Sequence, residues 1–119
     1  MREKMLTKHY IVLTILIFFV NNILIWYQLN GQLVWDFWKS WKGIGTSLLM
    51  ALPITALFWW ATKLGYQGFG NLWAVRFMGF ATSMISFPIM TWLYLGEVLS
   101  LKTILSLILA VAIMLLQLL

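Results

Sequence analysis

The chain has 119 residues, of which 63% are hydrophobic and only 9% are charged, with a net charge of +5. A soluble domain carries about 25% charged residues, so this composition excludes a soluble fold and indicates a membrane protein. The positive charge then fits basic flanks that face anionic lipid headgroups rather than a surface for nucleic acid. The absence of cysteine excludes disulfides and thiolate metal sites.

Four apolar windows are long enough to cross a bilayer, which takes about 20 residues. They predict an all-α fold, an integral membrane four-helix transmembrane bundle, formed as a single domain over residues 1–119. The expected spans cover residues 9–29, 44–62, 72–94 and 103–119.

The links between these spans are short and rich in turn residues. They are "NGQ" at 30–32, the glycine-rich "KLGYQGFGN" at 63–71, and "LGEVLS" at 95–100, where Ser100 is the expected N-cap of the last helix. Short links make neighbouring helices antiparallel. An even number of spans then puts both termini on one side of the membrane.

The first span carries polar side chains at helical spacing. Thr14, Asn21 and Gln28 are seven residues apart and form one stripe, and Asn22 stands beside it. Buried amides need hydrogen-bond partners, because each unsatisfied one costs several kcal/mol in hydrocarbon. The stripe therefore faces other helices or a wet cavity. Two readings stay open: hydrogen bonds between helices, or a wall that faces a substrate.

The segment "WDFWKSWKG" follows the first span. Trp35, Trp38 and Trp41 recur at every third residue and predict one face of a short helix, with Lys39 and Lys42 off that face. We expect the indoles to lie at headgroup depth, on the side opposite the termini. An aromatic box for a ligand and a nucleic-acid patch are the alternatives.

The third span holds Arg76, the one charge that falls inside a predicted span, followed by Gly79, Ser83 and Ser86 on roughly one face. Charge within a membrane is expensive and suggests function. Yet a long side chain near a helix end can also snorkel to phosphate. As a functional residue beside Gly79 and Ser83, Arg76 would favour a carboxylate, a phosphate or a polar neutral solute.

The fourth span carries a stripe of small and polar residues, Thr103, Ser106, Ala110 and Gln117. Such a stripe suits helix packing or self-association. We expect a homodimer held partly through Ser106 and Ala110, because four helices enclose little volume.

The sequence predicts no catalytic centre, no cofactor and no metal site. Glu3, Asp36 and Glu97 are far apart in flanks or links, and no nucleophile–base pair or phosphate loop occurs. His9 is the single histidine and stands at the edge of the first span, where an interfacial role is expected. We therefore expect no enzyme and no nucleic-acid partner.

The distribution of basic residues predicts the orientation. Five basic residues on the side of the termini stand against three on the other, which favours cytoplasmic termini in a bacterial inner membrane. The five are Arg2, Lys4, Lys8, Lys63 and Arg76, and the three are Lys39, Lys42 and Lys102.

The segment "PIMTWLYLGEVLSLKTILSLILAVAIMLL" at 88–116 combines a proline, an aromatic-rich part, "LGE", a short link and a final apolar helix. In this order of features it resembles the end of a drug/metabolite transporter repeat. "ATKLGY" at 61–66, the pair Trp26-Tyr27, and Arg76 standing 21 residues before Glu97 are similar to features of small uncharacterised four-helix members.

This resemblance implies a small multidrug resistance-like fold and a homodimer. The small multidrug resistance proteins are exporters that exchange protons for cationic substrates at a glutamate in the first helix. This sequence has no acid in its first span. The superfamily also carries neutral and anionic metabolites. We therefore expect a small transporter-like membrane protein that moves a small metabolite or drug-like solute as a dimer, or alternatively a non-transporting membrane subunit or scaffold. The candidate substrate-binding residues are Asn21, Asn22, Arg76 and Ser83.

Overall fold

The computed structural model describes the backbone of residues 2–119 and the side chains of residues 5–119. Over these residues the chain is helical and contains no strand. The elements are α1 (Arg2–Asn30), a 3₁₀ turn (Gly31–Leu33), α2 (Asp36–Lys39), α3 (Trp41–Phe69), α4 (Leu72–Leu95) and α5 (Leu101–Leu118). Four helices, α1, α3, α4 and α5, are long and apolar enough to cross a membrane. This is the architecture of a multi-pass integral membrane protein.

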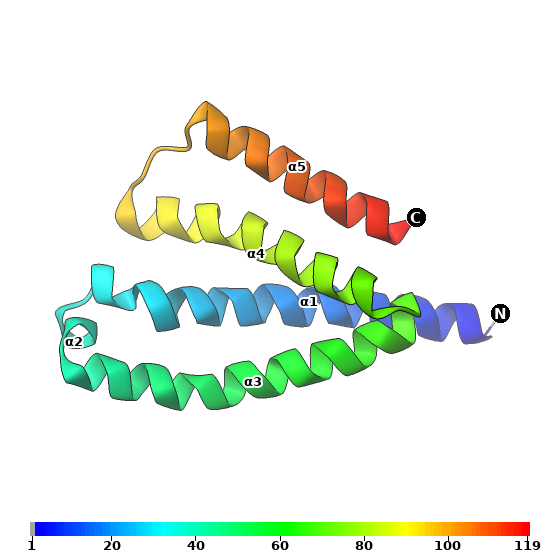
Figure 1. The fold of residues 1–119 in the computed structure, drawn as a ribbon, viewed down its shortest axis with the longest axis horizontal. Helices are drawn as coiled ribbons and strands as arrows, with labels where there is room; N and C mark the ends of the chain where they lie inside the picture. The colour runs from blue at the N-terminus through cyan, green and yellow to red at the C-terminus, as the bar shows by residue number, and fades with distance from the viewer. Residues whose placement is uncertain (1) are drawn as a thin grey trace.

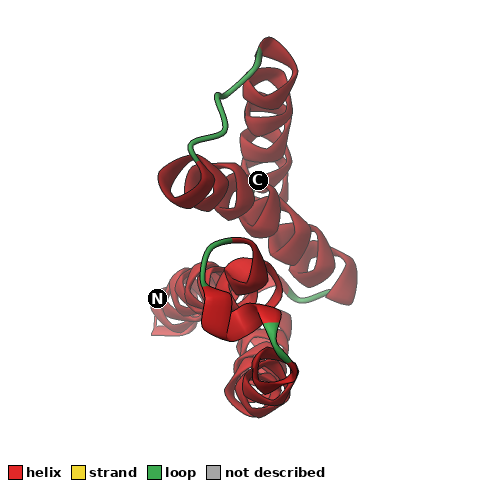
Figure 2. Cartoon of the chain, turned by 90° about the vertical axis from the view of Figure 1, so that its left-hand side faces the viewer, coloured by secondary structure: helices red, strands yellow, loops and turns green. Residues whose placement is uncertain are grey.

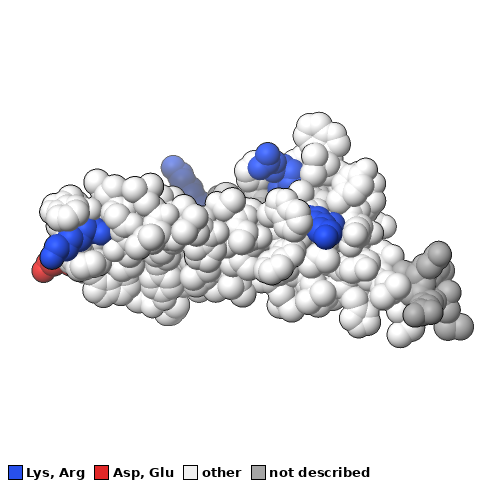
Figure 3. Space-filling view, turned by 90° about the horizontal axis from the view of Figure 1, so that it is seen from below, with Lys and Arg blue, Asp and Glu red and all other residues white. Residues whose placement is uncertain are grey.

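The four long helices alternate in direction, so α1 begins and α5 ends on the same side (Figure 1). Helix α1 lies between α3 and α4 and packs against both, and α5 packs on α4. Seen nearly end-on, the helices form a bent row rather than a ring around one axis (Figure 2). Seen from below, charged side chains occur at a few separate places on an uncharged surface, as lipid contact requires (Figure 3).

The glycine-rich segment 63–71 is not the link that its composition predicts. Helix α3 continues to Phe69, and Gly70 alone takes the left-handed backbone (φ 81°) that ends it. Gly65 lies inside the helix, where α1, α3 and α4 meet. A Cβ there would stand 2.9 Å from Val75 Cγ2 and 3.0 Å from Thr14 Cγ2. The glycine serves the close approach of three helices, and that role outweighs its weak helix propensity.

This contact gives a prediction with an internal control. Gly65→Ala should lower the free energy of unfolding by about 1–3 kcal/mol, because its methyl group has no room between α1 and α4. Gly45→Ala is the control, because a Cβ at Gly45 meets nothing within 4 Å. It should be neutral or stabilise α3 by about 0.5–1 kcal/mol. Unfolding in SDS-titrated mixed micelles, followed by circular dichroism, measures both variants. Equal effects of the two alanines would contradict the packing role of Gly65.

The other helix starts follow local capping chemistry. The side chain of Asn71 accepts a hydrogen bond from the backbone N–H of Ala74 at 2.8 Å at the start of α4. Ser100 accepts one from the N–H of Thr103 at 3.2 Å at the start of α5, which confirms its expected role as an N-cap. These caps fix where the last two long helices begin.

The three tryptophans of "WDFWKSWKG" do not share one helix, so that expectation is wrong. Trp35 precedes α2 in extended backbone, Trp38 lies in α2, and Trp41 begins α3. The half-buried Trp38 ring packs over Gly31, where a Cβ would stand 2.7 Å from Trp38 Cδ2. Trp41 is 78% exposed. The three tryptophans therefore differ in exposure: Trp38 is half-buried, Trp35 is exposed at 37%, and Trp41 is the most exposed.

Helix α5 is peripheral. Ala110 is its one buried residue, at 2% exposure, so it packs within the chain and is not available to a second copy. Ser106 is half-buried and donates to the carbonyl of Lys102 at 2.9 Å. The expectation that Ala110 holds a dimer is therefore wrong. Lipid covers an apolar helix as well as a core does, so α5 needs only one neighbour.

Candidate functional site

Helix α1 holds α3 through its stripe of polar residues. Gln28 Nε2 donates to the carbonyl of Ser47 at 2.8 Å, and the Ser47 hydroxyl donates to the carbonyl of Gln28 at 2.8 Å. One end of the stripe, Thr14, is fully buried beside Gly65. The stripe therefore faces α3. Gln28 matches the first of the two interpretations, hydrogen bonds between helices, whereas the Thr14 hydroxyl donates to the carbonyl of Tyr10 in its own helix at 2.7 Å.

Asn21, in the middle of the same stripe, is a buried amide without a partner. It is 0% exposed, and neither Nδ2 nor Oδ1 makes a hydrogen bond. An unsatisfied buried amide destabilises the fold, and nothing in the packing explains why an amide stands here.

A second face of α1 holds α4. Asn22 Nδ2 donates to Thr82 Oγ1 at 3.0 Å, and Trp26 Nε1 donates to Thr91 Oγ1 at 3.1 Å. The ring of Phe18 packs against Gly79, with Cε1 3.3 Å from the position of a Cβ there. Sequence reasoning missed Thr82 and Thr91. Their one available signal was that each is a hydroxyl residue inside an apolar span.

Replacing the two asparagines by leucine should therefore have opposite effects on stability. Asn21→Leu loses no hydrogen bond and removes a buried unsatisfied amide, so the free energy of unfolding should stay level or rise by up to about 1–3 kcal/mol. Asn22→Leu loses the hydrogen bond to Thr82 and should lower the free energy of unfolding by about 0.6–1.7 kcal/mol. Steric-trap unfolding in bicelles measures both. A loss of stability in Asn21→Leu equal to that in Asn22→Leu would show that Asn21 has a structural partner.

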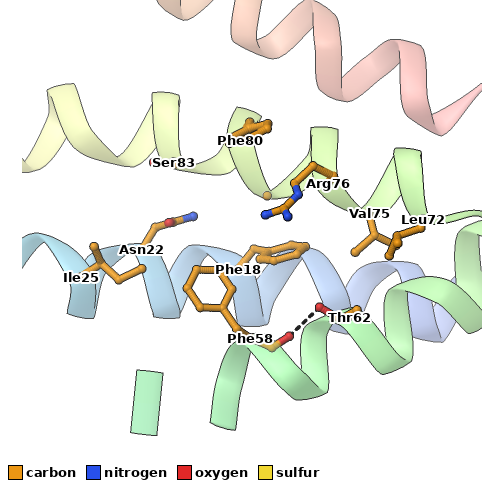
Figure 4. A pocket seen from close by; sticks show the side chains of 11 residues that line it. Phe18, Asn22, Ile25, Phe58, Thr62, Leu72, Val75, Arg76, Phe80 and Ser83 are labelled. Carbon is orange, nitrogen blue, oxygen red and sulfur yellow. Dashed lines mark hydrogen bonds between the residues drawn. The ribbon is translucent and has the colours of Figure 1, made fainter. Parts of the chain in front are cut away.

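A hollow of about 550 Å³ lies between α1, α3 and α4 (Figure 4), and we name it the α1–α3–α4 hollow. Three of the four candidate residues, Asn22, Arg76 and Ser83, line it, and Asn21 does not. The other lining residues are Phe18, Ile25, Phe58, Thr62, Leu72, Val75, Gly79 and Phe80. The fold thus brings together an amide, a guanidinium and a hydroxyl from positions up to 61 residues apart.

Arg76 is turned into the span. It stands one turn after Leu72, about 6 Å along the axis of α4. Its guanidinium carbon lies 5.8 Å from the ring centroid of Phe80, one turn further into the helix. Figure 4 shows the guanidinium directed away from Leu72, toward the space between Phe18 and Asn22. A side chain that snorkels to headgroups at the start of α4 would point the other way.

The guanidinium has no carboxylate partner within the part of the chain whose side chains the structure describes. Among residues 5–119 the structure shows one ion pair, between Lys39 and Asp36 at 3.4 Å, within α2. The Thr62 hydroxyl is occupied, because it donates to the carbonyl of Phe58 at 2.8 Å (Figure 4). Asn22 uses its Nδ2 on Thr82, which leaves its amide oxygen free to accept from another group.

The walls of the hollow around these polar groups are aromatic. The rings of Phe18 and Phe58 meet edge to face with centroids 6.3 Å apart, and Phe80 lies beside the guanidinium. Such an apolar lining with few polar groups is typical of sites for small organic ligands.

A second hollow of about 490 Å³ is lined by residues of α4, α5 and the link between them, and we name it the α4–α5 crevice. Glu97 and Lys102 line its end near the link, and Ser106 lines its wall on α5. Ser83 lines both hollows, so the two spaces share one wall at the middle of α4.

An aromatic cluster closes the end of the α1–α4 pair that lies opposite Arg76. Trp26 stacks on Tyr94 with centroids 5.2 Å apart, the hydroxyls of Tyr27 and Tyr94 are hydrogen-bonded, and Trp35 packs edge to face on Tyr94. The Trp26-Tyr27 pair thus serves packing between α1, α4 and the segment before α2.

Within the described residues, no group of three His, Asp or Glu side chains could hold a metal ion. Comparisons with protein-family models, with curated proteins and with solved structures found no match.

Proposed function

We propose that this protein is a small transporter-like membrane protein that moves a small metabolite or drug-like solute across the membrane as a dimer. One observation carries the proposal: the guanidinium of Arg76, which has no carboxylate partner among residues 5–119, points along the span over the same hollow that Asn22 and Ser83 line. A membrane anchor would direct the guanidinium toward the headgroups, whereas a binding site for a polar or anionic solute needs it over the hollow.

The resemblance to small multidrug resistance-like proteins supports the dimer. The α1–α3–α4 hollow lies on the flank of a row of helices, so one copy does not enclose a pathway, and a second copy would. The same resemblance and the excess of basic residues on the side of the termini support a bacterial inner membrane with both termini cytoplasmic.

Proton-coupled export of cations is not the mechanism we propose. The acids outside the N-terminal flank, Asp36 and Glu97, lie at α2 and in the α4–α5 link, away from the α1–α3–α4 hollow. The charge in that hollow is positive, and it repels a cation.

The alternative is a non-transporting membrane subunit or scaffold. It is favoured by the bonds of Gln28 and Asn22, which join α1 to α3 and α4 and would suffice for packing alone. It leaves the inward direction of Arg76 without a role, and for that reason we rank it second.

The first test of transport is Arg76→Lys. Lysine keeps the charge and a long stem but lacks the planar fork that binds an anion through two hydrogen bonds. We expect folding and assembly to persist while flux falls about tenfold, which corresponds to the loss of one charge-assisted hydrogen bond. Flux of radiolabelled carboxylates and phosphates into proteoliposomes, matched for protein incorporation, measures the effect. Equal flux in wild type and Arg76→Lys would indicate that Arg76 is a membrane anchor, and it would favour the scaffold alternative.

The second test concerns the dimer. Leu109 on α5 is 65% exposed, whereas its neighbour Ala110 is 2% exposed. Since the chain has no native cysteine, Leu109→Cys should form disulfide-linked dimers in lipid nanodiscs, and Ala110→Cys should not. Mild oxidation followed by gel electrophoresis gives the result. A monomer from both variants, with a monomeric particle mass, would contradict assembly through α5.

A further inference from the structure

We propose that the α1–α3–α4 hollow binds an amphiphile with an anionic head, a carboxylate or a phosphate, and an apolar tail. The inference names the ligand class of the site proposed above and rests on that function. It follows from three properties of the hollow: an unpaired guanidinium, an apolar aromatic wall, and an apolar rim on the flank of the molecule.

The head is selected by Arg76. A guanidinium inside a span needs a counter-charge, because an isolated charge in hydrocarbon costs several kcal/mol. Among residues 5–119 no carboxylate supplies one. A carboxylate or phosphate matches the planar fork of Arg76, and the Ser83 hydroxyl adds a polar group to the same lining.

The tail is selected by the rest of the lining. Among the described residues, Arg76 is the one charged residue that lines the hollow. Six lining residues are apolar side chains larger than alanine: Phe18, Ile25, Phe58, Leu72, Val75 and Phe80. A small polar metabolite would leave these surfaces without apolar contacts, whereas an alkyl or aryl group would cover them. The volume of about 550 Å³ is within the range of about 300–1,000 Å³ typical of pockets for drug-sized ligands.

The rim allows entry from the side. Leu72 and Phe80 on α4 are both 58% exposed, and Phe58 on α3 is 39% exposed. The wall of the hollow therefore continues into an apolar outer surface along the span. An amphiphile in the bilayer can pass this rim without leaving hydrocarbon, whereas a fully hydrated anion cannot.

The experiment measures retention of dodecyl phosphate by the full chain in dodecyl maltoside micelles, using native mass spectrometry. The detergent has the same tail and a neutral head, so dodecyl phosphate must be retained through its charge. We expect a bound dodecyl phosphate on the wild type, at least tenfold weaker retention by Arg76→Gln, and intermediate retention by Arg76→Lys. Lys63→Gln is the matched control, because Lys63 is a cation on α3 that does not line the hollow, and it should retain as much as wild type.

Inorganic phosphate provides a test that does not depend on any variant. Inorganic phosphate has the anionic head without the tail. It should give no adduct at a concentration at which dodecyl phosphate saturates the protein. Equal retention by wild type and Arg76→Gln, an equal loss in Lys63→Gln, or equal binding of inorganic phosphate would each overturn the inference.

Nanodiscs that contain phosphatidate distinguish the source of the ligand. A retained phosphatidate supports the inference with a bilayer lipid as the ligand. Retention of dodecyl phosphate without phosphatidate supports it with a single-chain amphiphile.

Failure of this inference is distinguishable from failure of transport. Retention that depends on Arg76, without flux of dodecyl phosphate in proteoliposomes, upholds the ligand class and overturns the transport function. Flux of a neutral solute that is unchanged in Arg76→Gln, without any dodecyl phosphate adduct, overturns the ligand class and leaves transport standing.

Discussion

A serine or threonine hydroxyl can bond a carbonyl of its own helix, whereas an amide or indole inside hydrocarbon needs a partner in another helix, and α1 carries such side chains on two faces. Gln28 exchanges hydrogen bonds with Ser47 on α3, and Asn22 and Trp26 donate to hydroxyls on α4. Because apolar contacts between helices gain little over lipid contacts, these directional bonds fix the register of α3 and α4 on α1. The position of every other element depends on that register.

The α1–α3–α4 hollow follows from this arrangement. Phe18 and Asn22 belong to the face of α1 that holds α4, and they also form the floor of the hollow. The bond from Asn22 to Thr82 sets the height of α4, and with it the position of Arg76 above Phe18. The same residues therefore serve packing and the proposed site, so a variant has to be assayed for stability as well as for flux.

Asn21 and Arg76 share an unusual property, because each is a polar group in the membrane-spanning part that the single chain leaves unsatisfied. They differ in access. Asn21 is fully buried, whereas Arg76 lines an open hollow. For this reason Arg76, and not Asn21, is the residue on which we base the proposed site.

The sequence by itself determined the helical class, the four apolar segments and the cap at Ser100, because these depend on composition, length and local hydrogen bonds. It also singled out Asn22, Arg76 and Ser83, since polar groups stand out in apolar spans. Only the tertiary structure decided that Gly65 continues α3, because the close contact of three helices outweighs local turn preference. It likewise decided the inward direction of Arg76 and the isolation of Asn21, because both depend on which side chains neighbouring helices present, and one helix's periodicity does not contain that information.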